Sequence, residues 1–322
     1  MAQHPAVAAV RRAVRRTLAE VEPGSVVVVA CSGGADSMAL LAATVAEARA
    51  PAIRVVGVTV DHGLQEGSAA LAARVVARMA ALGVDETVTA TVTVDPGGLG
   101  LEAAARRARY AVLDQVADSF GAAIVLLGHT RDDQAETVLL GLTRGSGGRS
   151  LAGMRRGFDR YRRPLLDVSR TDTVTACQVE GLEVWEDPHN ADPRFTRARV
   201  RATVMPLLED ELGPGVAETL ARTADQLRVD IDHLDDLAEA ALAGLADPTS
   251  VDELSALPTA VRRRVLRLLA LRAGAPGGEL FHQHVVAVDA LLTDWHGQRW
   301  VDLPGHLRAV RRDGRLVVES ST

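Results

Sequence analysis

The segment that most constrains the fold is residues 26–37, which read VVVVACSGGADS. Four consecutive valines predict a short strand that is buried on both faces of a parallel sheet. Gly33 and Gly34 end that strand, and an apolar-periodic helix is predicted over residues 38–49. Such a turn binds anions, because its backbone N–H groups and the positive end of the helix dipole point into one concavity.

The polar residues of this turn narrow the choice of ligand. Ser32 and Ser37 can donate hydroxyls to phosphate oxygens, whereas Asp36 repels phosphate unless a divalent cation lies between them. The segment lacks the Gly-Lys-Ser/Thr of a Walker A loop and the third glycine of a dinucleotide-binding turn. We therefore predict a nucleotide bound with magnesium, and Asp36 as the residue that holds the metal.

The composition limits the class of protein. A chain of 322 residues, 47% of them hydrophobic, is expected to form two domains. No run of 18 uncharged apolar residues occurs, and arginines interrupt the N-terminal segment 7–20, so we expect a cytoplasmic protein with no membrane contact. Only Cys31 and Cys177 are present, too few for a disulfide framework or a cysteine-built zinc site.

Strands and helices alternate after the first strand. Further strands are predicted at residues 53–60, 86–94 and 123–127, separated by helices long enough for parallel crossovers. This alternation predicts an α/β fold, a doubly wound parallel sheet of the Rossmann-like type.

Three polar clusters follow predicted strands. They are SGGADS at residues 32–37, DHGL at 61–64 and GHTRDDQAET at 128–137. Ligands of doubly wound sheets bind outside the carboxyl ends of the strands, so we expect the three clusters to converge on one site.

The basic residues are all arginine, and they are unevenly distributed. The net charge of −6 disfavours a protein that coats nucleic acid, but it leaves room for a local basic patch. Arginines gather at residues 155–163 and 194–201, which makes a polyanion a candidate partner. Arg197 and Arg201 would share one helix face, which suits phosphates and exposed ion pairs equally.

The domain boundaries follow from changes in composition. We predict a nucleotide-binding domain at residues 1–215, a helical connector at 216–248 and a small α+β C-terminal domain at 249–322. Two amphipathic helices and a hairpin with Asp313-Gly314 as its turn make up the last domain. A short strand is also predicted at residues 183–185.

Several motifs together resemble a known family. SGGADS is similar to the PP-loop of ATP pyrophosphatases, which split ATP between the α- and β-phosphates. DHGL, Glu102, DDQAET, RPLL at 163–166 and WEDP at 185–188 occur in the same order in the tRNA(Ile)-lysidine synthetase family. The resemblance covers about the first two thirds of the chain.

The resemblance implies an activity and its partners. ATP would adenylate the 2-oxo group of the wobble cytidine of tRNA(Ile) with a CAU anticodon, and free lysine would then displace AMP. The C-terminal domain would contact the tRNA. A homodimer is left open. Because the chain ends soon after the hairpin, it would be a short form that lacks the last C-terminal domain of longer relatives.

The residues that match the family motifs acquire expected roles. The nucleotide would be held by Ser32, Gly33, Gly34, Ala35, Asp36, Ser37, Asp61 and His62. The catalytic residues would be Asp36, Asp132, Glu136, Arg106 and His129, of which Asp132 or Glu136 would bind lysine or magnesium. Helix capping is the alternative for the acidic trio at 132–136, although capping needs only one carboxylate. A solvated helix face is the alternative for Arg106.

Other functions fit parts of the same pattern. A tRNA 2-thiolation enzyme would act on the same ring carbon, but sulfur carriage usually needs paired cysteines or an iron–sulfur cluster. A small-molecule amide or amidine synthetase would not need the arginine-rich segments. A regulatory nucleotide-binding module would not need the acidic trio. Thr130 stands where a second histidine is common in the family, so its role stays open.

Overall fold

The computed structural model describes residues 3–61, 67–92, 101–143, 147–185 and 192–321, with the side chains of residues 101 and 102 left out. His62 and residues 186–191 of the predicted motifs therefore lie outside the described residues. The chain forms two compact units, one of Met1–Val138 with Met154–Arg222 and the other of Leu139–Gly153 with Thr223–Thr322. The predicted boundaries at 215 and 248 remain predictions.

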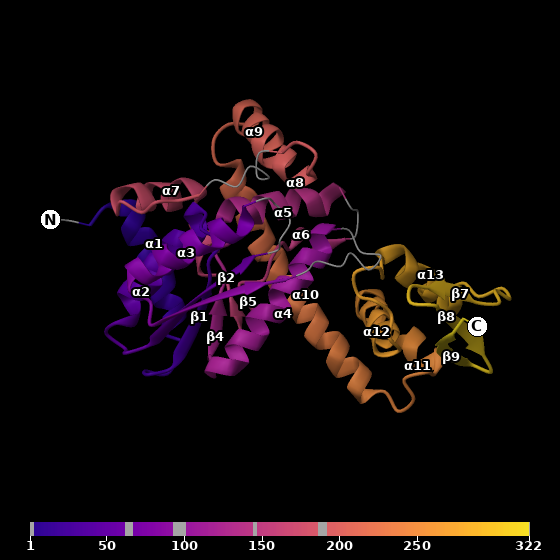
Figure 1. The fold of residues 1–322 in the computed structure, drawn as a ribbon. Helices are drawn as coiled ribbons and strands as arrows, with labels where there is room; N and C mark the ends of the chain where they lie inside the picture. The colour runs from indigo at the N-terminus through magenta and orange to yellow at the C-terminus, as the bar shows by residue number, and fades with distance from the viewer. Residues whose placement is uncertain (1–2, 62–66, 93–100, 144–146, 186–191, 322) are drawn as a thin grey trace. The chain divides into compact units, whose positions relative to one another are not determined.

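The first unit is built on a six-stranded sheet with the order β3-β2-β1-β4-β6-β5. Neighbouring strands are parallel except for β5 and β6, which form a short antiparallel edge. This sheet confirms the predicted doubly wound α/β fold (Figure 1). The strands are β1 (Val26–Ala30), β2 (Arg54–Asp61), β3 (Glu86–Thr91), β4 (Ile124–Leu126), β5 (Gly157–Phe158) and β6 (Tyr161–Arg162).

The strand order reverses at β1. Val27 pairs with Val55 of β2 on one side and with Ile124 of β4 on the other. The chain thus runs outward from β1 to β3 and then returns to the opposite side of β1 to form β4. A crevice for a ligand opens at such a switch point, outside the carboxyl ends of the two strands. The turn after β1 and the segment after β4 lie there.

Helices cover both faces of the sheet. Helices α1 (Pro5–Leu18), α2 (Ala35–Ala48), α3 (Ser68–Leu82) and α7 (Arg170–Val179) pack on one face around a core that includes Val27 and Val29. Helix α4 (Leu101–Phe120) covers the other face, where Leu113 packs with Val28 and Val56. The alternating valines of β1 are therefore buried on both sides, as their run predicts.

The remaining elements of the first unit connect the sheet to the site. Helix α2 begins at Ala35, three residues earlier than predicted, because Gly34 in extended conformation serves as its N-cap. The strand predicted at 183–185 is absent, since this segment makes a single backbone bond to the turn after β1, from Trp185 N–H to the Gly33 carbonyl. The other elements are α5 (Arg131–Thr143), η1 (Pro164–Asp167), α8 (Thr196–Arg199), η3 (Val200–Val204) and α9 (Met205–Leu212).

The η3 segment is a π-helical turn. Pro206, the second residue of α9, has no N–H to donate to the preceding turn, so the regular α-helical ladder cannot run through this point. Turns of this kind often adjust the side chains of a functional site. Here the turn contains Arg201 and follows directly on α8, which contains Arg197.

The second unit contains a three-stranded antiparallel sheet in the order β7-β8-β9, which is the predicted small α+β part. Both Asp313 and Gly314 have positive φ, as a two-residue hairpin turn requires. Its elements are α6 (Gly148–Leu151), α10 (Val216–Gly244, from Thr223 onward), α11 (Val251–Ala256), α12 (Thr259–Arg272), α13 (His282–Thr293), β7 (Val301–Leu303), β8 (Leu307–Arg312) and β9 (Arg315–Ser320).

The core of the second unit is separate from that of the first. Leu254, Val265, Leu291 and Ala309 are among the side chains that it buries. No helix within the described ranges is long and apolar enough to cross a membrane.

Candidate active site

The turn after β1 is held open by its own polar groups. Gly33 has φ +85°, and a Cβ atom there would lie 2.7 Å from Val75 Cγ2, so only glycine fits. The Ser37 hydroxyl accepts from the Ser32 N–H at 3.2 Å and donates to the Gly34 carbonyl at 2.9 Å. Ser32 itself is exposed. The loop therefore keeps a fixed curve, with Ser32 on its exposed side.

The end of β4 packs directly against the start of α2. A Cβ on Gly128 would lie 3.2 Å from the backbone carbonyl of Asp36 and 3.2 Å from Ser37 Cα. Glycine at this position allows two strand ends to meet closely. The SGGADS and GHTRDDQAET clusters thus converge at the switch point, as their positions after β1 and β4 predict.

Asp36 lies in the first turn of α2 and is held from α7. Its carboxylate accepts a hydrogen bond from the Thr173 hydroxyl, and Arg170 Nε lies 3.6 Å away. Burial raises the pKa of Asp36, although Thr173 and Arg170 act in the opposite direction. About a quarter of the side chain is exposed, so the carboxylate can still meet a ligand.

Three carboxylates project from the first turns of α5. Asp132 accepts from the backbone N–H of Arg170 at 2.8 Å. Asp133, the third residue of α5, accepts from the N–H and hydroxyl of Thr130, the residue before the helix, and so takes part in capping it. Glu136 is 1% exposed and makes no cap. One carboxylate of the trio therefore caps α5, and the other two have different partners.

Three arginines surround Asp133 and Glu136. Arg170 of α7 lies 2.9 Å from Asp133 and 3.2 Å from Glu136. Arg197 donates to Glu136 at 2.9 Å, and Arg201 binds Glu136 at 2.7 Å and Asp133 at 3.0 Å. Arg197 and Arg201 thus make inward ion pairs rather than exposed ones. We call this set, with Asp36, the carboxylate–arginine network.

The network shifts the pKa values of two of its members. Burial alone raises the pKa of Asp133, but the charges of Arg170 and Arg197 and the hydrogen bond from the Thr130 N–H outweigh it, so the net shift is downward. Burial lowers the pKa of Arg170, but Asp133, Glu136 and Asp36 outweigh it and raise it. Both groups are therefore held in their charged forms.

His129 follows β4 and lies beside the network. Burial is the main cause that lowers its pKa to about 3; Arg163, Arg109 and Arg197 add to this effect, whereas Asp133 opposes it. Arg163 Nε donates to His129 Nδ1 at 3.3 Å. His129 is consequently a neutral imidazole with its proton on Nε2, which can donate a hydrogen bond at neutral pH.

Arg163 is buried, which differs from its predicted membership of an exposed basic segment. It is 5% exposed, and its guanidinium stacks 4.8 Å from the Phe158 ring centroid. It also donates to the hydroxyl of Tyr110 at 3.4 Å, and Tyr110 accepts in turn from the exposed Arg106 at 3.1 Å. Arg106 thus reaches His129 only through Tyr110 and Arg163.

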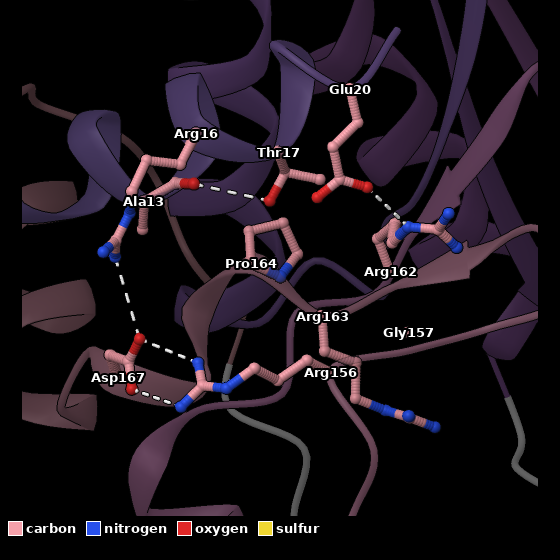
Figure 2. Close-up of a pocket in the computed structure, with 10 residues that line it drawn as sticks. All are labelled: Ala13, Arg16, Thr17, Glu20, Arg156, Gly157, Arg162, Arg163, Pro164 and Asp167. Carbon is pink, nitrogen blue, oxygen red and sulfur yellow. Dashed lines mark hydrogen bonds and ion pairs between the residues drawn. The ribbon is translucent and has the colours of Figure 1, made fainter.

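A separate pocket of about 260 Å³ lies on the α1 side of the same unit (Figure 2). Arg156 makes a bidentate pair with Asp167 at 2.8 Å, and Arg162 donates to Glu20 at 2.9 Å. The pocket contains no member of the carboxylate–arginine network. Part of the predicted basic segment is therefore neutralised by ion pairs.

The structure brings together most of the predicted site residues. Asp36, Asp132, Glu136 and His129 lie in or beside the network, next to the turn formed by residues 32–37. Asp61 ends the neighbouring strand β2 and is buried. The roles of all these residues remain predictions.

Arg170 and Thr173 are the contacts that the sequence did not predict. Thr173 lies 137 positions from Asp36 along the chain, and no local pattern links them. One signal was available: Ser169 and Asp172 form an N-cap pair that places Arg170 at the first position of a helix after RPLL. An acidic trio that is largely buried also needs cations from elsewhere.

A parallel sheet with a glycine-rich anion turn and an acidic residue at its switch point defines an ATP-binding domain of the PP-loop class. Residues 7–208 match the family described as PP-loop domain, and residues 250–317 match the family described as TilS substrate binding domain. Near full-length relatives narrow the class further. The chain belongs to the tRNA(Ile)-lysidine synthase family.

Three relatives show how much of the chain is shared. The tRNA(Ile)-lysidine synthase of Streptomyces coelicolor is 53% identical over 99% of both chains. That of Thermobifida fusca is 54% identical over 98% of both chains, and that of Mycobacterium bovis 49% over 90% of both. The similarity therefore spans both units.

A solved structure supports the fold. The U34-tRNA thiolase NcsA from Methanococcus maripaludis, solved with its [4Fe-4S] cluster, superposes with a TM-score of 0.56 at 17% identity. The match covers 69% of this chain and 79% of that one. At this identity the likeness concerns the fold alone.

Proposed function

We propose that this protein is a ligase that attaches free lysine to the 2-position of the wobble cytidine of tRNA(Ile) with a CAU anticodon. The cytidine oxygen attacks the α-phosphorus of ATP, and pyrophosphate leaves. An amino group of lysine then attacks carbon 2, and AMP leaves with the oxygen. The observation that carries the proposal is the family relationship over nearly the whole chain, together with the position of Asp36 at the switch point.

The chemistry explains why a PP-loop is needed. A carbonyl oxygen of cytosine is a poor leaving group, whereas AMP is a good one, so adenylation activates the ring carbon for attack by an amine. The backbone of Gly33 and Gly34 and the Ser32 hydroxyl would hold phosphate at the start of α2. Neutral His129 could donate a hydrogen bond to a substrate oxygen or phosphate.

Magnesium is part of the proposal. The described residues contain no group of three side chains that could hold a metal ion. Asp36 alone fits, since Mg²⁺ is often bound by one or two carboxylates together with the substrate phosphates. Its partly exposed carboxylate lies next to the phosphate-binding turn. Bound there, the ion would neutralise charge on the phosphates.

The amine substrate needs a negative surface. Among its described contacts, Asp132 uses one oxygen to accept from α7, so its other oxygen can meet a cationic amine. Glu136 has both oxygens bound by guanidinium groups. In this arrangement Glu136 positions the arginines, and direct binding of lysine by Glu136 would require one of them to move.

A thiolation enzyme is the second candidate, because a U34-tRNA thiolase shares the fold. The two cysteines speak against it. Both are buried, and burial raises the pKa of Cys31 and that of Cys177, the latter to about 12. Neither thiol is disposed to form the thiolate that sulfur transfer or cluster binding requires.

The test is pyrophosphate release from ATP by the purified protein, with labelled lysine and with tRNA(Ile) present or omitted. Release that depends on the tRNA, with label attached to it, is the expected result. Release with tRNA but without lysine attachment would favour thiolation. Release that needs no tRNA would favour a small-molecule acceptor.

A further inference from the structure

An exposed tryptophan marks one face of the C-terminal sheet. Aromatic residues make up only 3% of the chain, yet 43% of the surface of Trp300 is exposed. Trp300 directly precedes β7, one of the yellow strands in Figure 1. An indole that supports a small core would be expected inside it.

One face of this sheet packs into the core of the second unit, and on the opposite face Val310 is also buried. Leu303, Leu307, Ala309 and Leu316 point into the core of the second unit, against which α13 packs. Because side chains alternate along a strand, the residues between them point to the opposite face. We call this opposite side the outer face.

The outer face is rich in arginine. Arg308 and Arg312 lie on it from β8, and the register places Arg308 between Asp302 of β7 and Glu319 of β9. Continuing the alternation of β7 by one residue places Trp300 on the same face. Arg312 is 64% exposed, with its nearest carboxylate contact at 3.9 Å.

Two guanidinium groups lie over the Trp300 ring. Arg308 is 5.4 Å and Arg299 is 5.6 Å from a ring centroid of Trp300, and Glu319 fixes Arg308 at 2.8 Å. Exposed cation–π pairs contribute little to folding. Aromatic rings and guanidinium planes are, however, the surfaces on which unpaired bases stack, and arginines also attract the phosphates.

From this juxtaposition we propose that the outer face of the β7-β8-β9 sheet binds an unpaired nucleotide of the tRNA by stacking a base on Trp300. Arg299, Arg308 and Arg312 supply the positive charge that the phosphates require. The concentration of arginines here contrasts with the net charge of −6 of the whole chain. The assignment rests on the proposed function for the identity of the RNA.

The test measures the affinity of the full-length protein for a tRNA(Ile) transcript at fixed salt, together with tryptophan emission. We expect Trp300→Leu to weaken binding about tenfold, because the base loses its stacking partner. Trp300→Phe should retain most of the affinity. Phe281→Leu is the matched control, since Phe281 is similarly exposed, at 48%, and stacks on His284 instead of an arginine.

Emission gives an independent measurement. The tRNA should quench the wild-type protein, and Trp300→Phe should lose part of that quenching. Wild-type affinity in Trp300→Leu would overturn the assignment. If Trp300→Leu fails to fold by circular dichroism, unchanged quenching in Trp300→Phe would overturn it instead. A different result would contradict the proposed function alone: the wild-type protein binds tRNA at this face but attaches no lysine to it.

Discussion

Asp36 couples the turn after β1 to α7 through a single carboxylate. It is partly buried, and it keeps two partners, Thr173 and Arg170, while part of its surface still faces a ligand. Burial favours the neutral form of Asp36, whereas Thr173 and Arg170 favour its charged form. The role of Asp36 is therefore testable by removing its charge and keeping its shape.

Asp36→Asn should lower tRNA-dependent pyrophosphate release by about 10² or more, since the charge opposite the phosphates is lost. The variant should fold normally, because burial of the charge is no longer needed. Thr173→Val is the control: it removes the hydrogen bond to Asp36 and keeps the carboxylate, so its effect should be much smaller. Release at the wild-type rate by Asp36→Asn would remove Asp36 from the nucleotide site.

His129 should make stability depend on pH. Its folded pKa of about 3 lies below the ordinary value of 6.5, so between these values the unfolded chain binds more protons than the folded one. Stability must therefore fall as the pH drops from about 6.5 towards 3, by up to about 1.4 kcal/mol per pH unit. Urea unfolding at several pH values should show a shallower slope for His129→Gln. An identical slope would show that His129 is accessible to protons.

At the scale of elements, the site is an assembly of three helical segments around α5. Arg170 comes from α7, Arg197 from α8 and Arg201 from the π-helical turn η3, and all three converge on Glu136. The ion pairs of Glu136 with the three guanidinium groups fix the orientation of these segments. Breaking such a buried set by removing one partner costs more than the set contributes over an apolar core.

Glu136→Gln should therefore destabilise the first unit by about 2 to 4 kcal/mol, somewhat less than a fully buried broken pair because the arginines are partly exposed. Urea unfolding measures the effect. Asp132→Asn is the comparison, since Asp132 accepts only from a backbone N–H among its described contacts and should cost less. Equal stability of Glu136→Gln and the wild-type protein would show that the carboxylate does not hold the helices.

Local signals account for the elements that the sequence predicts. The valine run, the glycine turn and the start of α2 all lie within residues 26–37, and the Asp313-Gly314 turn identifies its own hairpin. Convergence of the clusters follows from the rules for parallel crossovers. The partners of the acidic trio come from distant segments, so no periodicity locates them. The sequence groups Arg163 with the neighbouring arginines, because no local pattern reveals its stacking on Phe158.

At the scale of the whole molecule, the two units have separate cores. The second core contains a buried ion pair, Arg262 with Asp289, at 2.6 Å, in which Asp289 is 3% exposed. Burial raises the pKa of Asp289, but Arg262 and Arg263 outweigh it and lower the pKa overall. Each unit thus has its own buried ion pairs, and the stability of each unit depends on the charges of those pairs.

Thermal unfolding should accordingly show two transitions. Asp289→Asn leaves Arg262 without its charge partner and should cost the second unit about 3 to 5 kcal/mol, while the transition of the first unit stays in place. Glu136→Gln should shift only the other transition. Calorimetry of both variants decides the matter: one transition that moves as a whole in each variant would show that the units unfold together.

Arg170 has a consequence for how each substrate affects the binding of the other. It is a shared counter-ion, since one guanidinium contacts Asp36 at the nucleotide turn and Asp133 and Glu136 on α5. Asp132, which we propose to meet the amine, accepts from the backbone N–H of the same residue, so a ligand that neutralises Asp36 acts on the residue that holds Asp132. Linkage then requires reciprocity: whatever factor ATP imposes on the affinity for the amine, the amine imposes on the affinity for ATP. The two substrates would be thermodynamically coupled without touching each other.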